Sequence, residues 1–382
     1  MKQYLLALST LTGTIIGVGF FGLPYVSSRI GFYPMLFYFF FLALISILVH
    51  LIFSEICLKT PGNHRLPGYA QIYLGKEAKW LSVFSTSLGL FGSNLAYIIV
   101  GGSFLAGLLM PILGGNLLIY TLIYFSVGAI LVYFGSKSIS EFEFFGLAIF
   151  FIAFIFIFVV SLRHIDIANH LTANFSLVNL FLPYGIILFS LSGMSIIPEI
   201  KELSHGNKKK MRSLVINAII ISTLTYIAFV FITQGVCGNK TTPDALDGLK
   251  NILGYRVLIA GFVVGVIATF TSYISSALTL KKIFSFDLKL PQILAWLLAS
   301  FVPILLYFLG LNDFIKIIGF IGAVTLGIDS IMIFLIYLKV KIKFSDKNEP
   351  IISLPKFAVY VLSAMLLIGV GLELLTTFKI LK

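Results

Sequence analysis

Long apolar runs follow one another along almost the whole of this 382-residue chain. A helix of about 20 apolar residues spans the hydrocarbon core of a bilayer, whereas a barrel strand needs about ten residues that alternate in polarity. Lipid offers backbone polar groups no partners, so only helices and closed barrels can cross it. Because the runs are too long for strands and do not alternate, the sequence predicts an all-α polytopic membrane protein.

Composition supports this fold class and argues against a nucleic-acid-binding protein. Hydrophobic residues make up 59% of the chain, charged residues make up 11%, and the mean hydropathy is +1.06. Soluble domains carry about 25% charged residues, so a water-soluble chain this apolar would have too little polar surface. The formal charge of +12 comes from basic residues in short clusters between the apolar runs. We therefore exclude nucleic acid as a partner.

The apolar runs and short connections predict a single transmembrane domain over 1–382 with about eleven helices. We expect spans at 4–28, 33–58, 79–110, 115–135, 143–162, 177–203, 211–236, 255–281, 291–310, 313–338 and 356–378.

Lysine and arginine orient these spans, because cytoplasmic loops carry an excess of them. With the N-terminus in the cytoplasm, 19 of these residues lie inside and 8 outside, which accounts for all 27. An odd number of spans then puts the C-terminus outside. We expect an integral protein of the cell membrane, plasma or inner, surrounded by membrane lipid. The basic cluster Lys208–Arg212 either fixes this topology or binds anionic lipid.

Two spans are interrupted near their middle by small or polar residues. The first span contains Gly13–Gly19, with three glycines in seven residues, and the sixth contains Ser190–Gly193. Each glycine costs a helix about 1 kcal/mol relative to alanine. Close helix packing through small residues is an alternative explanation for either segment alone. The two lie five spans apart, however, and matching breaks in two inverted halves indicate a transporter site.

The expected breaks bring opposite charges together at mid-membrane. Half-helices begin near Gly19 and Met194, and their positive dipole ends suit a carboxylate. The opposed half-helices end near Thr14 and Phe189, where free carbonyls suit an ammonium group or a metal cation. A site that favours an anion beside a cation suits a zwitterion, so the sequence predicts transport of a small amino acid.

Several motifs resemble those of a known transporter superfamily. GTIIGVGFFGLP at residues 13–24 is the most specific of them. PGYAQIYLG at 67–75, FSLSG at 189–193 with IPE at 197–199, and ATFTSY at 268–273 agree with it. Together they resemble the amino acid–polyamine–organocation superfamily, which has the LeuT-type fold. Within it, the chain resembles the hydroxy/aromatic amino acid permeases and the amino acid/auxin permeases. Lys281 and Lys282 depart from the pattern of tyrosine/tryptophan permeases, which often carry an acid there.

The resemblance implies a 5+5 inverted repeat, at roughly 1–165 and 175–340, with an extra helix at roughly 355–380 and with helices 1 and 6 broken. It implies secondary active transport of amino acids, aromatic or otherwise neutral, by alternating access with ion coupling. It also implies that the third span lines the pocket. The substrate-binding candidates are Thr14, Ile16, Gly17, Gly19, Asn94, Tyr97, Phe189, Ser190, Ser192 and Gly193.

The resemblance further implies a sodium site between the first and eighth spans. LeuT-type symporters use two carbonyls from the first break, with a carbonyl and two hydroxyls at i, i+3 and i+4 of the eighth helix. Ala268, Thr271 and Ser272 have that spacing on one helix face, and Gly13 and Ile16 match the carbonyl donors. Oxygen ligands suit this hard cation. Some proton-coupled relatives carry a lysine in the fifth helix, whose ammonium group takes the place of the ion. The fifth span of this chain contains no lysine. Proton coupling and passive exchange are the alternatives, and no other cofactor is expected.

Two acidic residues are candidates for gating or coupling. Asp329 lies within the tenth span, where a charge is costly and indicates a function; it either couples transport to an ion or pairs with a lysine. Glu199 follows the sixth-span break by about two turns and either forms part of an inner gate or makes a plain ion pair.

Three other functions compete with amino acid transport. A polyamine, nucleobase or other organic solute is the main alternative substrate, but no acid that would hold a cation stands at either break. An intramembrane enzyme would need a motif such as His-Glu-x-x-His or Gly-x-Ser-x-Gly, which the sequence lacks. A substrate sensor would need a long terminal domain, and both ends here are short. We expect a transporter and no enzyme.

Overall fold

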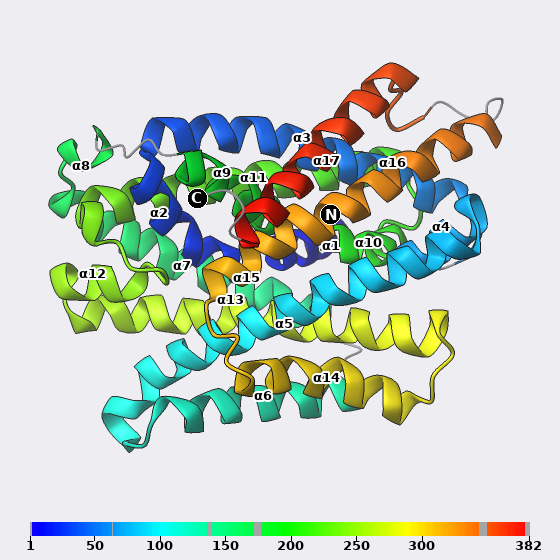
Figure 1. Ribbon diagram of the computed structural model, residues 1–382. Coiled ribbons are helices and arrows are strands. Elements are labelled where there is room, and N and C mark those ends of the chain that lie inside the picture. The colour runs from blue at the N-terminus through cyan, green and yellow to red at the C-terminus, as the bar shows by residue number, and fades with distance from the viewer. Residues whose placement is uncertain (1, 63, 136–138, 172–176, 344–349, 379–382) are drawn as a thin grey trace.

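The computed structural model describes residues 2–62, 64–135, 139–171, 177–343 and 350–378. Within these ranges every regular element is a helix, and Figure 1 shows long helices packed side by side in one bundle. The bundle is built from α1 Lys2–Ile15, α2 Gly19–Ile30, α3 Phe32–Lys59, α5 Lys76–Leu113, α6 Leu117–Phe134, α7 Ile139–Ser161, α9 Leu177–Ser190, α10 Ile197–Leu203, α11 Lys208–Cys237, α13 Tyr255–Lys282, α14 Gln292–Phe308, α15 Phe314–Phe320, α16 Leu326–Lys343 and α17 Lys356–Thr377.

Shorter helices connect or extend these elements. The connections contain α4 Leu66–Leu74, α8 Ala168–Leu171 and α12 Leu246–Leu253, with 3₁₀ turns η1 Leu162–His164 and η3 Gly238–Lys240. The 3₁₀ turn η2 Met194–Ile196 leads into α10, and two π-helical segments, η4 Ile283–Asp287 and η5 Ile321–Thr325, extend α13 and join α15 to α16.

Both predicted breaks are present. α1 and α2 are inclined at 49° to each other across a short gap, and three residues separate the end of α9 from the start of η2. Glycine and serine explain the positions, since glycine is a poor helix former and serine offers its backbone alternative hydrogen bonds. The interruptions lie at the residues where the sequence predicts them.

Length and composition identify nine or ten membrane spans among the described residues. Nine helices of the described residues are long and apolar enough to cross a membrane, and the bent pair α1–α2 brings the number to ten. α14 has only 17 residues, so length and composition alone do not confirm the predicted count of eleven.

Four pairs of spans that lie five apart along the chain pack against each other. α3 contacts α11, α5 contacts α13, α6 contacts α14, and the broken pair α1–α2 contacts α9 and α10. This pairing is the one expected of two interlocked halves. The repeat boundaries at 1–165 and 175–340 stay a prediction.

One crossing brings two backbones into direct contact. A Cβ on Gly322 of η5 would lie 1.7 Å from the carbonyl oxygen of Gly185 in α9, and a Cβ on Gly185 would lie 2.1 Å from the carbonyl oxygen of Gly319. Small residues allow such close approach in membranes. The N-terminal part of the tenth span, α15 and η5, is therefore held against α9, which ends at the second break.

We expect Gly322→Ala to destabilise the protein, because the added methyl group would push backbone against backbone. Overpacking of this kind costs about 1–3 kcal/mol, which would appear as a lower melting temperature in detergent. Gly371→Ala is the matched control, since a Cβ there has nothing within 4 Å. Equal melting temperatures for the two variants would contradict the contact.

Candidate functional site

The first break leaves backbone donors without partners. Gly17 N donates to the Ile15 carbonyl at 2.9 Å, and Phe20 N donates to the Gly17 carbonyl at 3.2 Å. The N–H groups of Val18 and Gly19 form no hydrogen bond within the described part of the chain. They stand at the start of α2, where the helix dipole is positive and favours an anion.

The second break is held by side chains of α3. Gly193 N donates to His50 Nε2 at 2.9 Å, and His50 Nδ1 lies 2.7 Å from the Ser46 carbonyl oxygen. Since Nε2 accepts, the proton is on Nδ1, which donates to that carbonyl. Ser46 Oγ in turn donates to the Leu191 carbonyl at 2.8 Å. Two neighbouring side chains of one helix thus satisfy backbone groups on both sides of the interruption.

One phenol joins the two breaks. The Tyr226 hydroxyl of α11 lies 2.7 Å from the Ile15 carbonyl oxygen and 2.7 Å from the Ser190 carbonyl oxygen. These are the last carbonyls of α1 and α9, which the breaks deprive of helical partners. Its single proton is shared between the two acceptors, so Tyr226 fixes the distance between the two broken helices.

Glycines let other side chains reach the first break. A Cβ on Gly19 would lie 2.2 Å from Ser190 Oγ, and a Cβ on Gly17 would lie 2.7 Å from the Tyr97 hydroxyl and 3.3 Å from Ser272 Oγ. Only glycine leaves room for these contacts. The first break is therefore in direct contact with the second break, with α5 and with α13.

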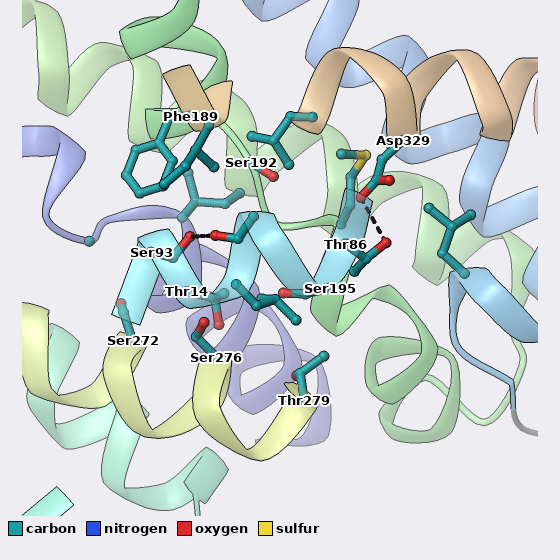
Figure 2. Close-up of a pocket in the computed structure, with 18 of the residues that line it drawn as sticks. Thr14, Thr86, Ser93, Phe189, Ser192, Ser195, Ser272, Ser276, Thr279 and Asp329 are labelled. Carbon is teal, nitrogen blue, oxygen red and sulfur yellow. Dashed lines mark hydrogen bonds between the residues drawn. The ribbon is translucent and has the colours of Figure 1, made fainter. Parts of the chain in front are cut away.

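A central cavity lies between the two breaks, α5, α13 and the tenth span. Figure 2 shows Thr14, Ser93, Phe189, Ser192 and Asp329 among the side chains around it. Its lining is Thr14, Ile15, Gly17, Gly19, Phe53, Arg65, Leu66, Thr86, Gly89, Leu90, Ser93, Tyr97, Phe189, Ser190, Ser192, Met194, Ser195, Pro198, Ser272, Ser276, Thr279, Ile283, Ile321, Leu326, Asp329 and Ile333.

Seven of the ten substrate candidates line this cavity, and three do not. Ile16 faces a smaller cavity, described below. Gly193 packs against Leu11 and Ile15. Asn94 is fully buried outside the lining, and neither polar atom of its side chain has a hydrogen-bond partner among the described residues.

The five sodium candidates lie together between α1 and α13. Gly13, Ile16, Ala268 and Thr271 line a small cavity closed by α7, and Ser272 Oγ donates to the Gly13 carbonyl at 3.2 Å. The Ile16 carbonyl has no backbone partner in the described residues, because Phe20 N turns to Gly17 instead. The set offers oxygen atoms only, as a hard cation prefers.

α3 and α13 end at Lys59 and Lys282 at the same end of the bundle, which we name the basic end. There Glu199 of α10 forms ion pairs with Arg65, which precedes α4, and with Lys282 of α13. The two terminal nitrogens of the Arg65 guanidinium, Nη1 and Nη2, donate to the Glu199 carboxylate. Lys282 Nζ lies 3.0 Å from Glu199 Oε1. A second cavity opens at this end and is lined by Glu199 and Lys282; it shares Thr279 with the central cavity. The ion-paired side chains therefore line both cavities: Arg65 lines the central one, and Glu199 and Lys282 line the second.

Asp329 of α16 makes no ion pair among the described residues. Its Oδ2 accepts from Thr86 Oγ1 at 2.9 Å, and its side chain lines the central cavity. Sequence reasoning singled out Asp329 and Glu199 but not Tyr226, Ser46 or the role of His50. No local pattern connects those three to the breaks that they hold.

We compared the chain with known protein families and solved structures. The model of the tryptophan/tyrosine permease family matches residues 1–372. The chain belongs to the tryptophan/tyrosine permease family. No curated protein matches the sequence of this permease. Among solved structures, it is similar to the crystal structure of MhsT in complex with L-phenylalanine, with a TM-score of 0.72, 16% identity, and coverage of 97% of this chain and 98% of that one.

These findings confirm the predicted recognition and the LeuT-type fold. The permease is an integral membrane protein that transports amino acids, and it is not an enzyme. The polyamine and nucleobase alternatives gain no support from either comparison.

We expect Tyr226→Phe to reduce uptake by at least about tenfold. The Ser190 carbonyl would lose its donor among the described residues, which costs about 1–3 kcal/mol, and the Ile15 carbonyl would keep only Gly17 N, so the two half-helices would lose their fixed spacing. The measurement is initial-rate uptake by the purified permease in proteoliposomes. Tyr273→Phe is the matched control, because Tyr273 is equally buried and its hydroxyl has no partner among the described residues. Equal uptake by both variants would show that the bridge is dispensable.

Proposed function

We propose that this permease carries aromatic amino acids across the cell membrane by sodium-coupled symport and alternating access. The observation that carries the proposal is the set of free N–H groups that begin two half-helices beside one cavity. Val18 and Gly19 supply them at the first break, and Met194 and Ser195 at the second; none of the four donates to a described residue.

These groups suit the two ends of an amino acid. The substrate carboxylate binds the N–H groups around Gly17 and Gly19, next to the Tyr97 hydroxyl. The ammonium group binds carbonyls at Phe189, Ser190 and Ser192. A carbonyl oxygen has two lone pairs, so the Ser190 carbonyl can accept from Tyr226 and from the substrate together. Phe53, Phe189 and Ile321 provide apolar walls that suit an aromatic side chain. The family and the phenylalanine bound to MhsT support that class.

Sodium binds in the small cavity in this proposal, through the carbonyls of Gly13, Ile16 and Ala268 and the hydroxyls of Thr271 and Ser272. All five belong to α13 or to the segment that ends α1. A cation bound there would contact both the first break and the eighth span, α13. Because the substrate also binds at the first break, ion binding would be coupled to substrate binding. Proton coupling through Asp329 is the alternative, supported by the burial of that carboxyl in the cavity wall.

The basic end faces the cytoplasm in this proposal, in agreement with the excess of lysine and arginine expected there. The N-terminus is then cytoplasmic and the C-terminus external. Glu199, with Arg65 and Lys282, forms the inner gate, which opens when the substrate leaves toward the cytoplasm. Proteoliposome uptake of labelled amino acids, with sodium and proton gradients imposed separately, tests the function as a whole.

We expect Gly19→Val to abolish uptake of every substrate while the protein still inserts and purifies as a single species. Its Cβ would collide with Ser190 Oγ, 2.2 Å away, and its side chain would cover the N–H groups that meet the carboxylate. Gly371→Val, in open space on α17, is the control and keeps uptake. Normal uptake by Gly19→Val would exclude this site.

We expect uptake to fall by about tenfold or more when choline replaces sodium, and Thr271→Val to weaken the apparent sodium affinity by a similar factor. The variant removes one oxygen ligand and keeps the volume of the side chain. Thr269→Val is the control on the same helix, because Thr269 does not line the small cavity. Sodium-independent uptake would reject the ion site and direct the test to Asp329.

A further inference from the structure

The basic cluster Lys208–Arg212 at the start of α11 has no acidic partner within the described chain. Lys209 and Lys210 are exposed, and no residue of the cluster takes part in an ion pair with a described residue. By contrast, Lys282 at the basic end is paired with Glu199. The positive charge of the cluster is therefore available to a partner outside the described chain.

Below this cluster, one face of α11 changes in chemical character along its length. Two adjacent lysines come first, and the later residues follow at intervals of three or four, which places them all on one side of the helix. In order along the chain they are Lys209, Lys210, Ser213, Asn217, Ile220 and Leu224. Asn217 is exposed, and Ile220 and Leu224 are 45% and 62% exposed. The face presents positive charge, then polar groups, then hydrocarbon, over about 22 Å at 1.5 Å per residue.

α1 completes the polar part of this face. The Tyr4 hydroxyl lies 2.8 Å from Ser213 Oγ, and Asn217 Nδ2 donates to the Tyr4 hydroxyl at 2.9 Å and to Ser213 Oγ at 3.3 Å. Each hydroxyl holds one proton and the amide holds two, and the bonds among the three side chains use both amide protons and one hydroxyl proton. The other hydroxyl proton remains for an outside acceptor. Tyrosine is enriched at membrane interfaces, where the phosphate and ester oxygens of lipids lie.

We propose that this face of α11, together with Tyr4 of α1, binds one anionic phospholipid. Lys209 and Lys210 contact the phosphate, the spare hydroxyl proton of the Tyr4–Ser213 pair meets an ester oxygen, and an acyl chain lies along the apolar end of the face. Unpaired lysines favour a lipid with net negative charge, whereas a zwitterionic lipid brings a cation of its own. The site goes beyond the proposed function, since it involves neither the substrate nor the coupling ion.

Orientation in the membrane does not by itself explain this face. The bias that orients a span depends on how many basic residues lie near its end. Asn217 adds nothing to that bias, and an exposed amide on a lipid-facing helix is costly unless polar groups surround it. A lipid headgroup above Tyr4 and Ser213 provides such surroundings and also accounts for the order of charge, polar groups and hydrocarbon.

The proposed site joins two helices that form the breaks. α1 ends at Ile15, beside the first break, and α11 carries Tyr226, whose hydroxyl contacts both breaks. A ligand that binds the folded protein and not the unfolded one raises the melting temperature. A lipid bound across α1 and α11 is therefore expected to stabilise the permease.

The test is a titration of the purified full-length permease in detergent with dioleoyl phosphatidylglycerol, followed by the melting temperature. Two probes separate the contributions. Dioleoyl phosphatidylcholine has the same chains and esters without net charge, and glycerophosphoglycerol has the anionic headgroup without chains. We expect a saturable rise in melting temperature with phosphatidylglycerol alone. An equal rise with phosphatidylcholine would overturn the preference for an anionic lipid, and an equal rise with glycerophosphoglycerol would reduce the site to one for free phosphate esters. Either result refutes the proposal.

Variants assign the effect to this face. In the double variant Lys209→Gln, Lys210→Gln we expect the apparent affinity for phosphatidylglycerol to fall at least about tenfold, because both cations of the face are lost. The matched control is Lys76→Gln with Lys339→Gln, which changes the net charge equally at two exposed lysines of α5 and α16. Asn217→Leu keeps every charge and should also weaken binding, which gives a second reading if the double variant does not insert. Wild-type affinity in Asn217→Leu and in the double variant, or an equal loss in the control, would reject the site.

Discussion

The need to satisfy backbone hydrogen bonds in lipid governs this structure. A continuous helix meets that need by itself, and a broken one exposes donors and acceptors at mid-membrane. Two helices of the permease are broken, and side chains from neighbouring helices form hydrogen bonds with part of the exposed backbone. These side chains are Ser46 and His50 of α3, and Tyr226 of α11. The backbone groups that remain free are those at Val18, Gly19, Met194 and Ser195. The proposed binding site consists of backbone groups that the fold leaves without hydrogen-bond partners.

Close packing keeps those free groups in place. Gly17 and Gly19 admit Tyr97 and Ser190, and Gly185 and Gly322 bring α9 against the tenth span. A side chain at any of these positions would separate elements that share one cavity. Glycine, which favours the breaks by its low helix propensity, also brings the broken segments together.

Local patterns predict only part of this site. The break positions follow from glycine and serine propensity, and the grouping of Ala268, Thr271 and Ser272 follows from helical spacing, because both depend on residues near in sequence. The partners of Gly193 and Ser190 come from helices more than 30 residues away, and sequence spacing carries no sign of them. Asn94 shows the converse failure: it is a substrate candidate on the same helix as Ser93 and Tyr97, which line the cavity, but it does not line the cavity itself. A lysine at position 282 departs from the family pattern, and its ion pair with Glu199 in the folded protein gives a reason for it that the sequence does not show.

The ion pairs at the basic end have a kinetic consequence. Arg65, Glu199 and Lys282 are 15%, 23% and 40% exposed at their side chains, so the water and salt of the facing compartment reach them. Charges in such a setting are screened over a Debye length of about 8 Å at physiological ionic strength. Screening lowers the free energy needed to separate Arg65, α10 and α13, and it acts at the basic end and not at the two breaks. If these ion pairs form the proposed inner gate, its rate of opening rises with the ionic strength of the compartment that it faces.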